Sequence, residues 1–367
     1  MDGFEIDLAA CRKRQQQMLL YMQQQGIDAV LVTQVEHVQY FTGCRFAWMF
    51  QPAALLEGSG RVTLIAPQKT PEISAADEIL VYEAKWLSTL RNDQRQTSAQ
   101  VLLQSRLGKP PIKKLGVEYS SFGQHYTGLA NEVVDVEPEL YRMRRSKAPD
   151  ELARLRKAIQ ATQCMYETAR RILAPGLSEL EMFNALQATA VQECGEMLTG
   201  TGNDYQCASR GGAPRNRIAA AGELYILDLG PAFRGYFADN CRTLAVTEPT
   251  AVQLAAWQRI VEVFPFVEQE VKPGKSCREL FHQAQAMLDQ APVGKFNHHL
   301  GHGIGLFPHE GPHLNPNWND TFAEGDVFAC EPGLYAPELN AGIRVENDYL
   351  VTTNGVELLS NFPLDLK

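Results

Sequence analysis

The sequence predicts two domains: an α/β domain over residues 1–145, then an α+β domain over residues 146–367 that contains an internal duplication. Three observations lead to this prediction. The chain of 367 residues is too long for one ordinary hydrophobic core. Strand-like and helix-like segments alternate through its first part. Its second part carries several short segments twice, in the same order.

Composition and charge narrow the class of protein. Hydrophobic residues make up 45% of the chain and charged residues 21%, which is typical of a soluble globular protein. A formal net charge of −9 argues against nucleic acid as a partner, because binding a phosphate backbone requires a clustered positive surface. The chain shows no apolar run of about 18 residues and no signal-like start, and its eight cysteines form no C-x-x-C pair. We therefore expect a cytoplasmic protein without a membrane partner.

The first domain is expected to begin with an amphipathic helix from Leu8 to Gly26, which the glycine would end as a C-cap. A polar helix is expected near residues 93–108, and Tyr40-Phe41-Thr42-Gly43 closes another element. Apolar runs predict strands over 27–32, 61–66, 78–82 and 114–118. No catalytic cluster is visible in this domain, so we expect it to support or shape the neighbouring site, or to contact a partner.

A basic stretch, residues 141–147, marks the predicted boundary. Either a solvated linker or an anion-binding patch would suit it, and the acidic balance of the whole chain favours the linker. Ser146 or Asp150 is expected to cap a long helix that runs to about Leu173.

The duplication in the second domain consists of three matched segments. Residues 175–183 recur as residues 273–281, each with Pro-Gly, then a serine and, three residues later, a glutamate, which predicts a capped helix. Residues 222–230 are echoed by residues 325–333: a glycine turn, an apolar strand, one carboxylate and a second glycine. The third pair is Asp239-Asn240 and Glu346-Asn347. Three matches in one order indicate two related halves.

Residues 297–312 concentrate four of the eight histidines between glycines and prolines: His298, His299, His302 and His309. Glycines on both sides of His302 would let the backbone approach an ion closely. By itself this stretch is equally compatible with a hydrogen-bonded polar loop and with a metal site.

Four carboxylates in the matched segments favour the metal site. Asp228 and Glu331 each end an apolar strand, where an unpaired charge would be costly. Asp239 and Glu346 lie on what are predicted to be the returning strands of hairpins. Four carboxylates converging in a core would repel one another unless cations neutralise them. Together with His302 they suit two divalent ions about 3.5–4 Å apart.

These residues resemble the M24 metallopeptidase family, which has the pita-bread fold and includes aminopeptidase P, prolidase and methionine aminopeptidase. The resemblance covers essentially the whole chain, because residues 1–145, including Tyr40 to Gly43, resemble the creatinase/prolidase-type N-terminal domain, and residues 145–151 resemble the start of the catalytic domain. It implies that Asp228 chelates one metal and that His302 and Glu331 chelate the other. Asp239 and Glu346 would bridge the two.

The same resemblance implies a mechanism. Two cations would lower the pKa of a bridging water and so provide hydroxide near neutral pH. Glu331 would accept the proton of this water, and His309 and His298 would hydrogen-bond the substrate carbonyl or the oxyanion. Arg344 would orient a ligand carboxylate or contact the substrate terminus. His299 is expected to be structural. The mostly oxygen ligand set favours Mn; Co, Zn and Fe are the other metals usual in the family.

The chain departs from the family pattern at three places. Where a Pro-His is usual before the first metal strand, residues 208–216 form a shorter segment with Arg215 at the expected histidine position. Arginine cannot act as a neutral proton shuttle and prefers a carboxylate partner, so Arg215 would suit a different, anionic substrate. Cys241 stands where threonine is usual, and Asn347 where aspartate is usual.

The leading interpretation is a dinuclear metal hydrolase that removes the N-terminal residue from Xaa-Pro peptides, of the aminopeptidase P or prolidase type. The alternatives are an amide hydrolase of the same fold that acts on other substrates, suggested by Arg215, and a binding protein that has lost catalysis. Methionine aminopeptidase is disfavoured because the N-terminal domain would be superfluous. By resemblance we also expect a homodimer.

Overall fold

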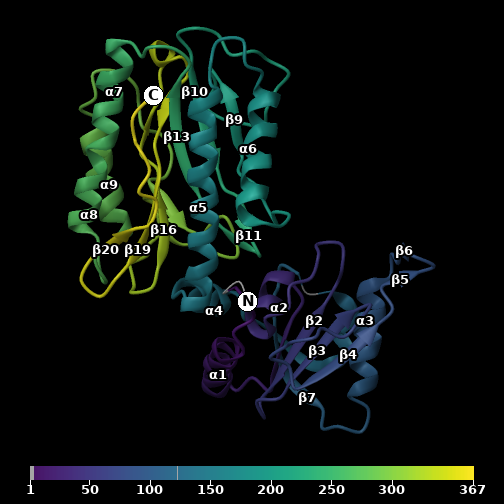
Figure 1. Ribbon diagram of the computed structural model, residues 1–367. Coiled ribbons are helices and arrows are strands. Elements are labelled where there is room, and N and C mark those ends of the chain that lie inside the picture. Colours follow the sequence, from purple (N-terminus) through teal and green to yellow (C-terminus); the bar gives the residue numbers. More distant parts are fainter. Residues whose placement is uncertain (1–3, 122) are drawn as a thin grey trace. The chain divides into compact units, whose positions relative to one another are not determined.

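The computed structural model describes residues 4–121 and 123–367 of the chain. They form two compact units, Met1–Arg144 and Arg145–Lys367, which are described separately as the first and the second unit (Figure 1).

The first unit is built on a mixed six-stranded sheet with the strand order β4-β3-β2-β1-β7-β8 (Figure 1). Strand β1 pairs antiparallel with β2 and parallel with β7, and β3 pairs antiparallel with β2 and parallel with β4, so the sheet mixes both kinds of pairing. The strands are β1 (Ala29–Val32), β2 (Ala53–Glu57), β3 (Val62–Pro67), β4 (Glu78–Tyr82), β7 (Ile112–Val117) and β8 (Ala130–Asp135), with a small hairpin of β5 (Lys85–Trp86) and β6 (Thr89–Leu90). The helices are α1 (Leu8–Gln25), α2 (Val35–Thr42), α3 (Gln94–Ser105), the 3-10 helix η1 (Gln124–Leu129) and α4 (Glu137–Arg145).

Local signals placed most of these elements correctly. The Asp7 side chain accepts a hydrogen bond from the Ala10 amide at the start of α1, and Gly26 ends that helix with φ 63°. Gly43 ends α2 in the same left-handed conformation. Strands β2 and β8 were not predicted from the sequence. Strand β2 is Ala-Ala-Leu-Leu-Glu, which lacks β-branched residues, and it is fixed by pairing with β1 and β3 on its two sides.

The solvated linker predicted for residues 141–147 is wrong. Residues up to Arg145 belong to helix α4, and Arg144 is only 1% exposed. Arg145 donates from Nε to Asp326 Oδ1 at 2.9 Å and from Nη2 to Asp326 Oδ2 at 2.6 Å. Lys147 pairs with Glu310 at 2.6 Å, with both side chains buried. These positive charges are internal partners of acidic groups far along the chain, so local sequence alone could not identify them.

The predicted caps of the next helix are also wrong. Helix α5 (Pro149–Ile172) has Ala148 at its N-cap, and the Glu151 side chain accepts from the Ala148 amide at 2.9 Å. Proline in the first turn fixes the start of the helix, because its missing N–H would have had no partner there.

Replacing Arg145 by methionine is expected to destabilise the second unit by about 3–5 kcal/mol, because it leaves the fully buried Asp326 carboxylate without its bidentate partner. Arg142→Met provides the control, because that guanidinium lies on the same helix, is 69% exposed and pairs with Glu139 at the surface. It should cost less than about 1 kcal/mol. Urea unfolding followed by circular dichroism checks this pair; equal losses would contradict the internal role of Arg145.

The second unit consists of two halves, each with a sheet and its own helices (Figure 1). Helix α5 packs on the strands of the first half, and α7 and α9 pack on strands of the second. The first half comprises α5, α6 (Glu179–Cys194), the sheet β13-β10-β9 (Asn240–Ala245, Leu224–Leu229, Asp204–Cys207) and the hairpin β11-β12 (Ala232–Phe233, Tyr236–Phe237). The second half comprises α7 (Ala251–Val261), α8 (Val263–Glu270), α9 (Cys277–Leu288), the sheet β15-β14-β16-β19-β20 (Glu310–Leu314, Gly301–Gly303, Val327–Cys330, Asn347–Val351, Val356–Leu358), the pair β17-β18 (Gly333–Leu334, Ile343–Arg344) and the 3-10 helix η2 (Pro337–Leu339).

The structure reproduces the internal duplication seen in the sequence. Ser178 caps α6 and Ser276 caps α9, each through its side-chain oxygen. In the first half β10 returns antiparallel as β13 after the hairpin β11-β12; in the second, β16 returns as β19 after β17-β18. The two matched carboxylate pairs therefore lie at corresponding ends of two similar hairpins.

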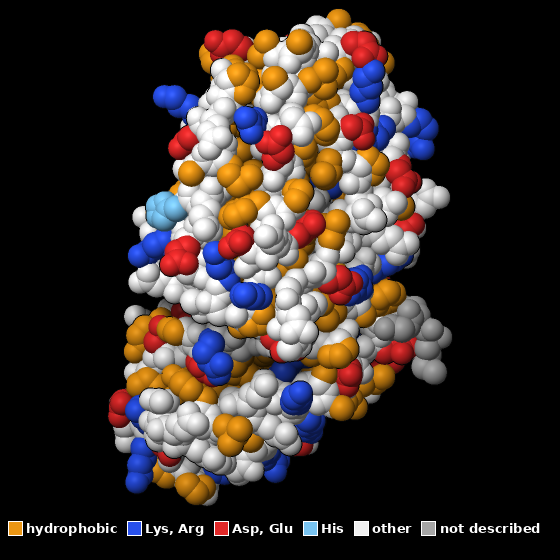
Figure 2. All heavy atoms as spheres, turned by 90° about the vertical axis from the view of Figure 1, so that its left-hand side faces the viewer, with side chains coloured by type: hydrophobic (Ala, Val, Ile, Leu, Met, Phe, Trp, Pro, Cys, Tyr) orange, Lys and Arg blue, Asp and Glu red, His pale blue; other side chains and the backbone are white. Residues whose placement is uncertain are grey.

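The face of the second unit that carries α7, α8 and α9 is seen in Figure 2, where acidic and basic side chains are interspersed among apolar ones. Such mixing differs from the clustered positive surface that binds a phosphate backbone. Among the described residues, no helix combines the length and the apolarity that crossing a bilayer requires.

Candidate metal centre

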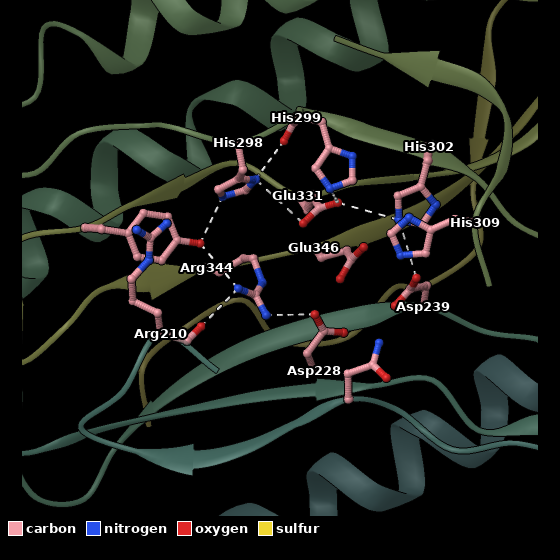
Figure 3. A pocket seen from close by; sticks show the side chains of 12 residues that line it. Arg210, Asp228, Asp239, His298, His299, His302, His309, Glu331, Arg344 and Glu346 are labelled. Carbon is pink, nitrogen blue, oxygen red and sulfur yellow. Dashed lines mark hydrogen bonds and ion pairs between the residues drawn. The ribbon is translucent and has the colours of Figure 1, made fainter. Parts of the chain in front are cut away.

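The two hairpins bring the four matched carboxylates into one cluster (Figure 3). In the first, Leu229 pairs with Asn240, so Asp228 and Asp239 flank the last pair of the ladder. In the second, Cys330 pairs with Asn347, which places Glu331 and Glu346 just beyond it. Oxygen atoms of Asp228, Asp239 and Glu346 lie within 4.8 Å of one another, and ligand atoms of His302, Glu331 and Glu346 do so as well.

His302 faces this cluster from β14, where it pairs with Ala329 of β16. Its Nε2 lies 3.5 Å from Asp239 Oδ2 and 3.6 Å from Glu331 Oε1. Its Nδ1 lies 3.0 Å from the Gly303 carbonyl, which can only accept, so Nδ1 carries the hydrogen and Nε2 is left to bind a cation. A Cβ at Gly301 would lie 1.9 Å from the Ala329 carbonyl oxygen, so only glycine permits this close strand contact.

The protonation equilibria of the cluster indicate a site built for cations. Burial, and then the neighbouring carboxylates, raise the pKa of Asp239 and of Glu346 well above the ordinary values. Burial raises the pKa of Glu331 to about 8 and lowers that of His302 well below its usual range. Glu346 Oε2 is buried and has no hydrogen-bond partner among the described residues. Bound cations would supply both the missing partner and the missing neutralisation, so the donor set fits divalent metal.

The cluster opens into a cavity of about 260 Å³ (Figure 3). Its lining is almost entirely polar, which suits a charged or hydrogen-bonding ligand. The lining residues are Asn203, Arg210, Asp228, Asp239, His298, His299, His302, His309, Glu331, Tyr335, Arg344 and Glu346.

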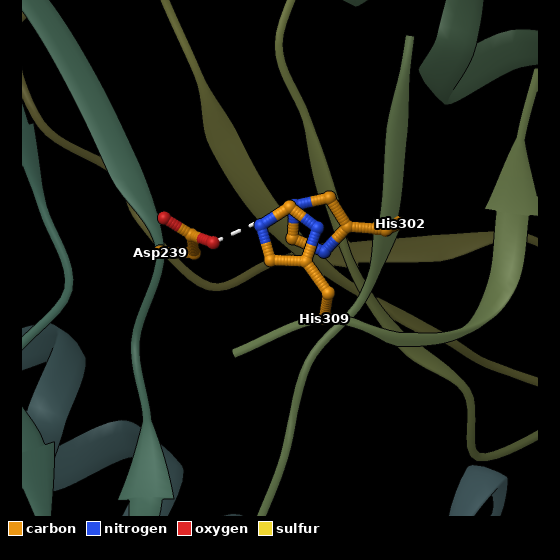
Figure 4. Close-up of side chains that lie close together, drawn as sticks. All are labelled: Asp239, His302 and His309. Carbon is orange, nitrogen blue, oxygen red and sulfur yellow. Dashed lines mark ion pairs between the residues drawn. The ribbon is translucent and has the colours of Figure 1, made fainter. Parts of the chain in front are cut away.

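Three further histidines predicted from the sequence face this cavity. The His309 ring stacks on that of His302 with centroids 3.7 Å apart, next to Asp239 (Figure 4). His298 lies with Nδ1 3.8 Å from Glu331 Oε2 and with Nε2 2.9 Å from the Tyr335 hydroxyl. The prediction that His299 is only structural is wrong, because it lines the cavity with its Nε2 3.1 Å from Glu331 Oε1.

Burial keeps these imidazoles neutral. It lowers the pKa of His298 to about 3 and that of His299 to about 4, with the nearby Arg344 or another histidine adding to the effect. Burial also lowers the pKa of His309. A neutral imidazole can donate from one nitrogen and accept at the other, so His309 can hydrogen-bond a substrate. Both nitrogens of His298, by contrast, already have partners, the His299 carbonyl and the Tyr335 hydroxyl.

Arg344 is engaged with acidic groups. Its Nη2 donates to Asp228 Oδ2 at 2.8 Å and also to the carboxylate of Asp204, and its Nη1 lies 3.3 Å from the Tyr335 hydroxyl. The guanidinium therefore orients Asp228 from behind, as one of the two sequence-based alternatives proposed. Asp204 and Tyr335 were not predicted, because each lies in a different segment and gains its place only through the fold.

The structure contradicts the suggested substrate role of Arg215. This guanidinium donates to the buried carboxylate of Glu179 from Nε at 3.0 Å and from Nη2 at 2.6 Å, and it does not line the cavity. The basic residue that this segment contributes to the cavity is Arg210.

The departures at Cys241 and Asn347 lie behind the ligands: the Cys241 thiol donates to the Arg344 carbonyl, and the Asn347 side chain accepts from the buried Arg242 at 2.9 Å.

Below about pH 6.5 the lowered pKa values of the buried histidines make the stability of the folded chain rise with pH, because the unfolded chain then binds more protons at these groups. Above that range, from pH 7 to 8, the stability of the metal-free folded chain is expected to fall as the pH rises. Glu331 has an ordinary pKa of 4.5 and a folded-state pKa of about 8, so between these values the folded chain binds more protons at this group than the unfolded chain. Its contribution is full below its ordinary pKa and is lost as the pH rises to the folded-state pKa, by at most about 1.4 kcal/mol per pH unit for each such group. Calorimetric melting in EDTA at pH 7, 7.5 and 8 measures the trend, and saturating Mn²⁺ should reverse it. A Tm that rises across this range in EDTA would contradict the prediction.

The hairpin-borne carboxylates and a neutral histidine form a candidate metal centre in a duplicated fold. Residues 153–353 match the model of metallopeptidase family M24, and residues 14–146 match that of the creatinase/prolidase N-terminal domain. The chain belongs to metallopeptidase family M24. This confirms the family and the fold class predicted from the sequence.

Individual proteins agree with this assignment. The chain is 29% identical over 350 residues to an uncharacterized peptidase of Staphylococcus aureus (strain MW2), covering 92% of this chain and 96% of that protein. Its fold resembles prolidase from Pyrococcus furiosus (TM-score 0.79, 22% identity, 94% of this chain and 99% of that one). It also resembles an Xaa-Pro dipeptidase from Bacillus anthracis, with a TM-score of 0.81, 23% identity and coverage of 98% of this chain and 99% of that one. An X-Pro aminopeptidase from Thermotoga maritima MSB8 is similar as well, with a TM-score of 0.79, 23% identity and coverage of 96% of this chain and 98% of that one.

Proposed function

We propose that this protein is a dinuclear metallopeptidase that removes the N-terminal residue from Xaa-Pro peptides. The observation that carries the proposal is the convergence of Asp228, Asp239, His302, Glu331 and Glu346 at one end of a polar cavity. Cleavage of the bond before proline is supported by the solved structures named above. Two of them are named for Xaa-Pro or X-Pro substrates.

The ligand roles follow from the positions of the side chains. Asp239 and Glu346 share ligand sets with residues of both halves, which suits bridging positions; Asp228 would complete one site, and His302 and Glu331 the other. When bound, two divalent ions lower the pKa of water and polarise a carbonyl. The mostly oxygen donor set favours Mn²⁺, with Co²⁺, Zn²⁺ and Fe²⁺ as the other candidates.

Other tasks of the site are proton transfer, hydrogen bonding to the substrate and alignment of the metal ligands. Glu331 would accept a proton from the attacking water and deliver it to the leaving amine. His309, whose pKa burial lowers, would donate a hydrogen bond to the carbonyl oxygen as negative charge develops on it. Arg344 fixes Asp228 and so keeps one metal ligand aligned.

The structure does not support the predicted donation from His298 to the substrate. The single N–H of neutral His298 lies at Nδ1 and donates to the His299 carbonyl at 2.8 Å, and its Nε2 faces the Tyr335 hydroxyl.

An amide hydrolase of the same fold with another substrate was suggested by Arg215, and the pairing of Arg215 with Glu179 removes that reason. A silent binding protein is disfavoured, because all five ligand positions are filled by ligand residues. We also propose that the protein is cytoplasmic and acts as a homodimer.

A hydrolysis screen of the purified, Mn²⁺-reconstituted protein tests the proposal. The substrates are Xaa-Pro dipeptides, Xaa-Pro-Yaa tripeptides and acylated amino-acid amides, with Glu331→Gln as the blank. We expect cleavage before proline that is absent in the variant. Metal binding without cleavage of any Xaa-Pro bond would refute the peptidase assignment.

A further inference from the structure

One arginine at the cavity differs from all the others near it in having no acidic partner. Arg210 lines the cavity with an exposed side chain. Among the described residues, its side chain makes one hydrogen bond, from Nη2 to Asn297 Oδ1 at 2.6 Å, and has no ion pair. The neighbouring arginines are all paired: Arg344 with Asp204 and Asp228, Arg215 with Glu179, and Arg217 with Glu223.

The Arg210 guanidinium is also held in place before any ligand binds. Its central carbon lies 3.9 Å from the centroid of the Tyr335 ring, so the planar group stacks on an aromatic face. The Tyr335 hydroxyl in turn contacts His298 Nε2 at 2.9 Å. With Nη2 bound to Asn297, the Nε and Nη1 groups remain available as donors for a ligand.

The loop that carries Arg210 is shaped to present it. The Gly212 amide donates to Asp204 Oδ1 at 2.6 Å, so the chain wraps closely around that carboxylate. A Cβ at Gly211, which has φ 149°, would lie 2.2 Å from Asp204 Oδ2. Only glycine allows this approach, which fixes the residue immediately after Arg210.

The charge of the site also leaves Arg210 without a carboxylate partner, an inference that rests on the proposed function. Two divalent ions and Arg344 match the charge of the four carboxylate ligands and Asp204, so none of these carboxylates is left over for Arg210. Figure 3 shows it at the opposite side of the cavity from Asp239, beyond His298. A peptide whose scissile bond lies at the carboxylate cluster could therefore place a negative group against Arg210.

We propose that Arg210 is a specificity-determining residue that binds the free C-terminal carboxylate of a short peptide substrate. A planar guanidinium with two free N–H donors suits a carboxylate, whereas a C-terminal amide would offer it no negative charge. The enzyme would thus select di- or tripeptides with free C-termini over amidated or longer chains.

Calorimetric binding of the dipeptide Pro-Leu and of its C-terminal amide to the Mn²⁺-loaded protein tests this inference without requiring turnover. We expect the wild type to bind the acid at least about tenfold more tightly than the amide. In Arg210→Gln this ratio should fall to within about threefold of unity, and Arg210→Lys should give an intermediate ratio, because it keeps the charge but not the fork. Arg217→Gln, from the same segment but paired with Glu223, should retain the wild-type ratio.

Equal binding of acid and amide by the wild type, an unchanged ratio in Arg210→Gln, or no binding of either peptide would overturn the inference. If Arg210 only tethered its loop to Asn297, Arg210→Gln would lower Tm and leave the ratio unchanged. The kcat/KM values for Xaa-Pro-Leu and its amide separate this result from the proposed function. Hydrolysis of both at equal rates would refute the role of Arg210 alone, whereas hydrolysis of neither would refute the peptidase assignment.

Discussion

Replacing Glu331 by glutamine is expected to reduce kcat for Xaa-Pro hydrolysis by at least about 10³-fold. The change removes a negative ligand oxygen from a carboxylate that both His298 and His299 approach, at 3.8 and 3.1 Å. Without metal, burial raises the pKa of Glu331 to about 8; a bound cation would favour the carboxylate form, which is the form that can accept a proton. Steady-state hydrolysis at saturating Mn²⁺ and pH 7.5 measures the loss.

A matched control separates this role from general damage to the site. Glu324→Gln changes an exposed glutamate of the same unit that accepts a hydrogen bond from Thr353, and it should leave kcat within about twofold of wild type. A Glu331→Gln enzyme that keeps more than a tenth of the wild-type kcat at saturating metal would exclude Glu331 as the proton acceptor.

Replacing His309 by alanine is expected to lower kcat by about 10²–10³-fold with little change in KM, because a donor to the developing oxyanion acts mainly in the transition state. The side chain is exposed towards the cavity and stacks on His302, so its removal should leave the fold intact. Full kinetics on a good Xaa-Pro substrate provide the measurement.

Metal content must be measured in parallel, because His309 also lies in a possible ligand set with Asp239 and His302. Two ions per chain in His309→Ala would attribute the lost rate to the oxyanion contact. His282→Ala supplies the control, since that residue lies on α9, away from the cavity lining. If His309→Ala instead raised KM tenfold at unchanged kcat, His309 would be a ground-state binding residue.

Sequence patterns predicted what depends on local chemistry or on the duplication. Gly26 and Gly43 end helices where the chain must turn through a left-handed residue, and Ser178 and Ser276 cap helices with their own oxygens. The carboxylate positions could be proposed because two similar hairpins repeat one arrangement, so each half supports the interpretation of the other.

Pairings between distant segments could not be predicted in this way. Arg145 and Lys147 look like a solvated basic linker until Asp326 and Glu310 are seen beside them. Within the loop 208–216 the sequence does not say which arginine points to the cavity. The buried Glu179 pairs with Arg215. The two glycines that follow Arg210 pack against Asp204 and Gln206, whereas Arg210 itself stacks on Tyr335. His299 likewise gains its place only because β14 lies beside β16, the strand that immediately precedes Glu331.

Metal content per chain is the most direct test of the central claim that five side chains hold two divalent ions. Elemental analysis would be made on wild-type protein reconstituted with Mn²⁺ and gel-filtered, and on the variants Asp228→Asn, Asp239→Asn and Glu346→Gln. The account predicts two ions per wild-type chain, at most one in Asp228→Asn, and fewer than one in the two variants that remove bridging ligands. Two ions per chain in all three variants would contradict it.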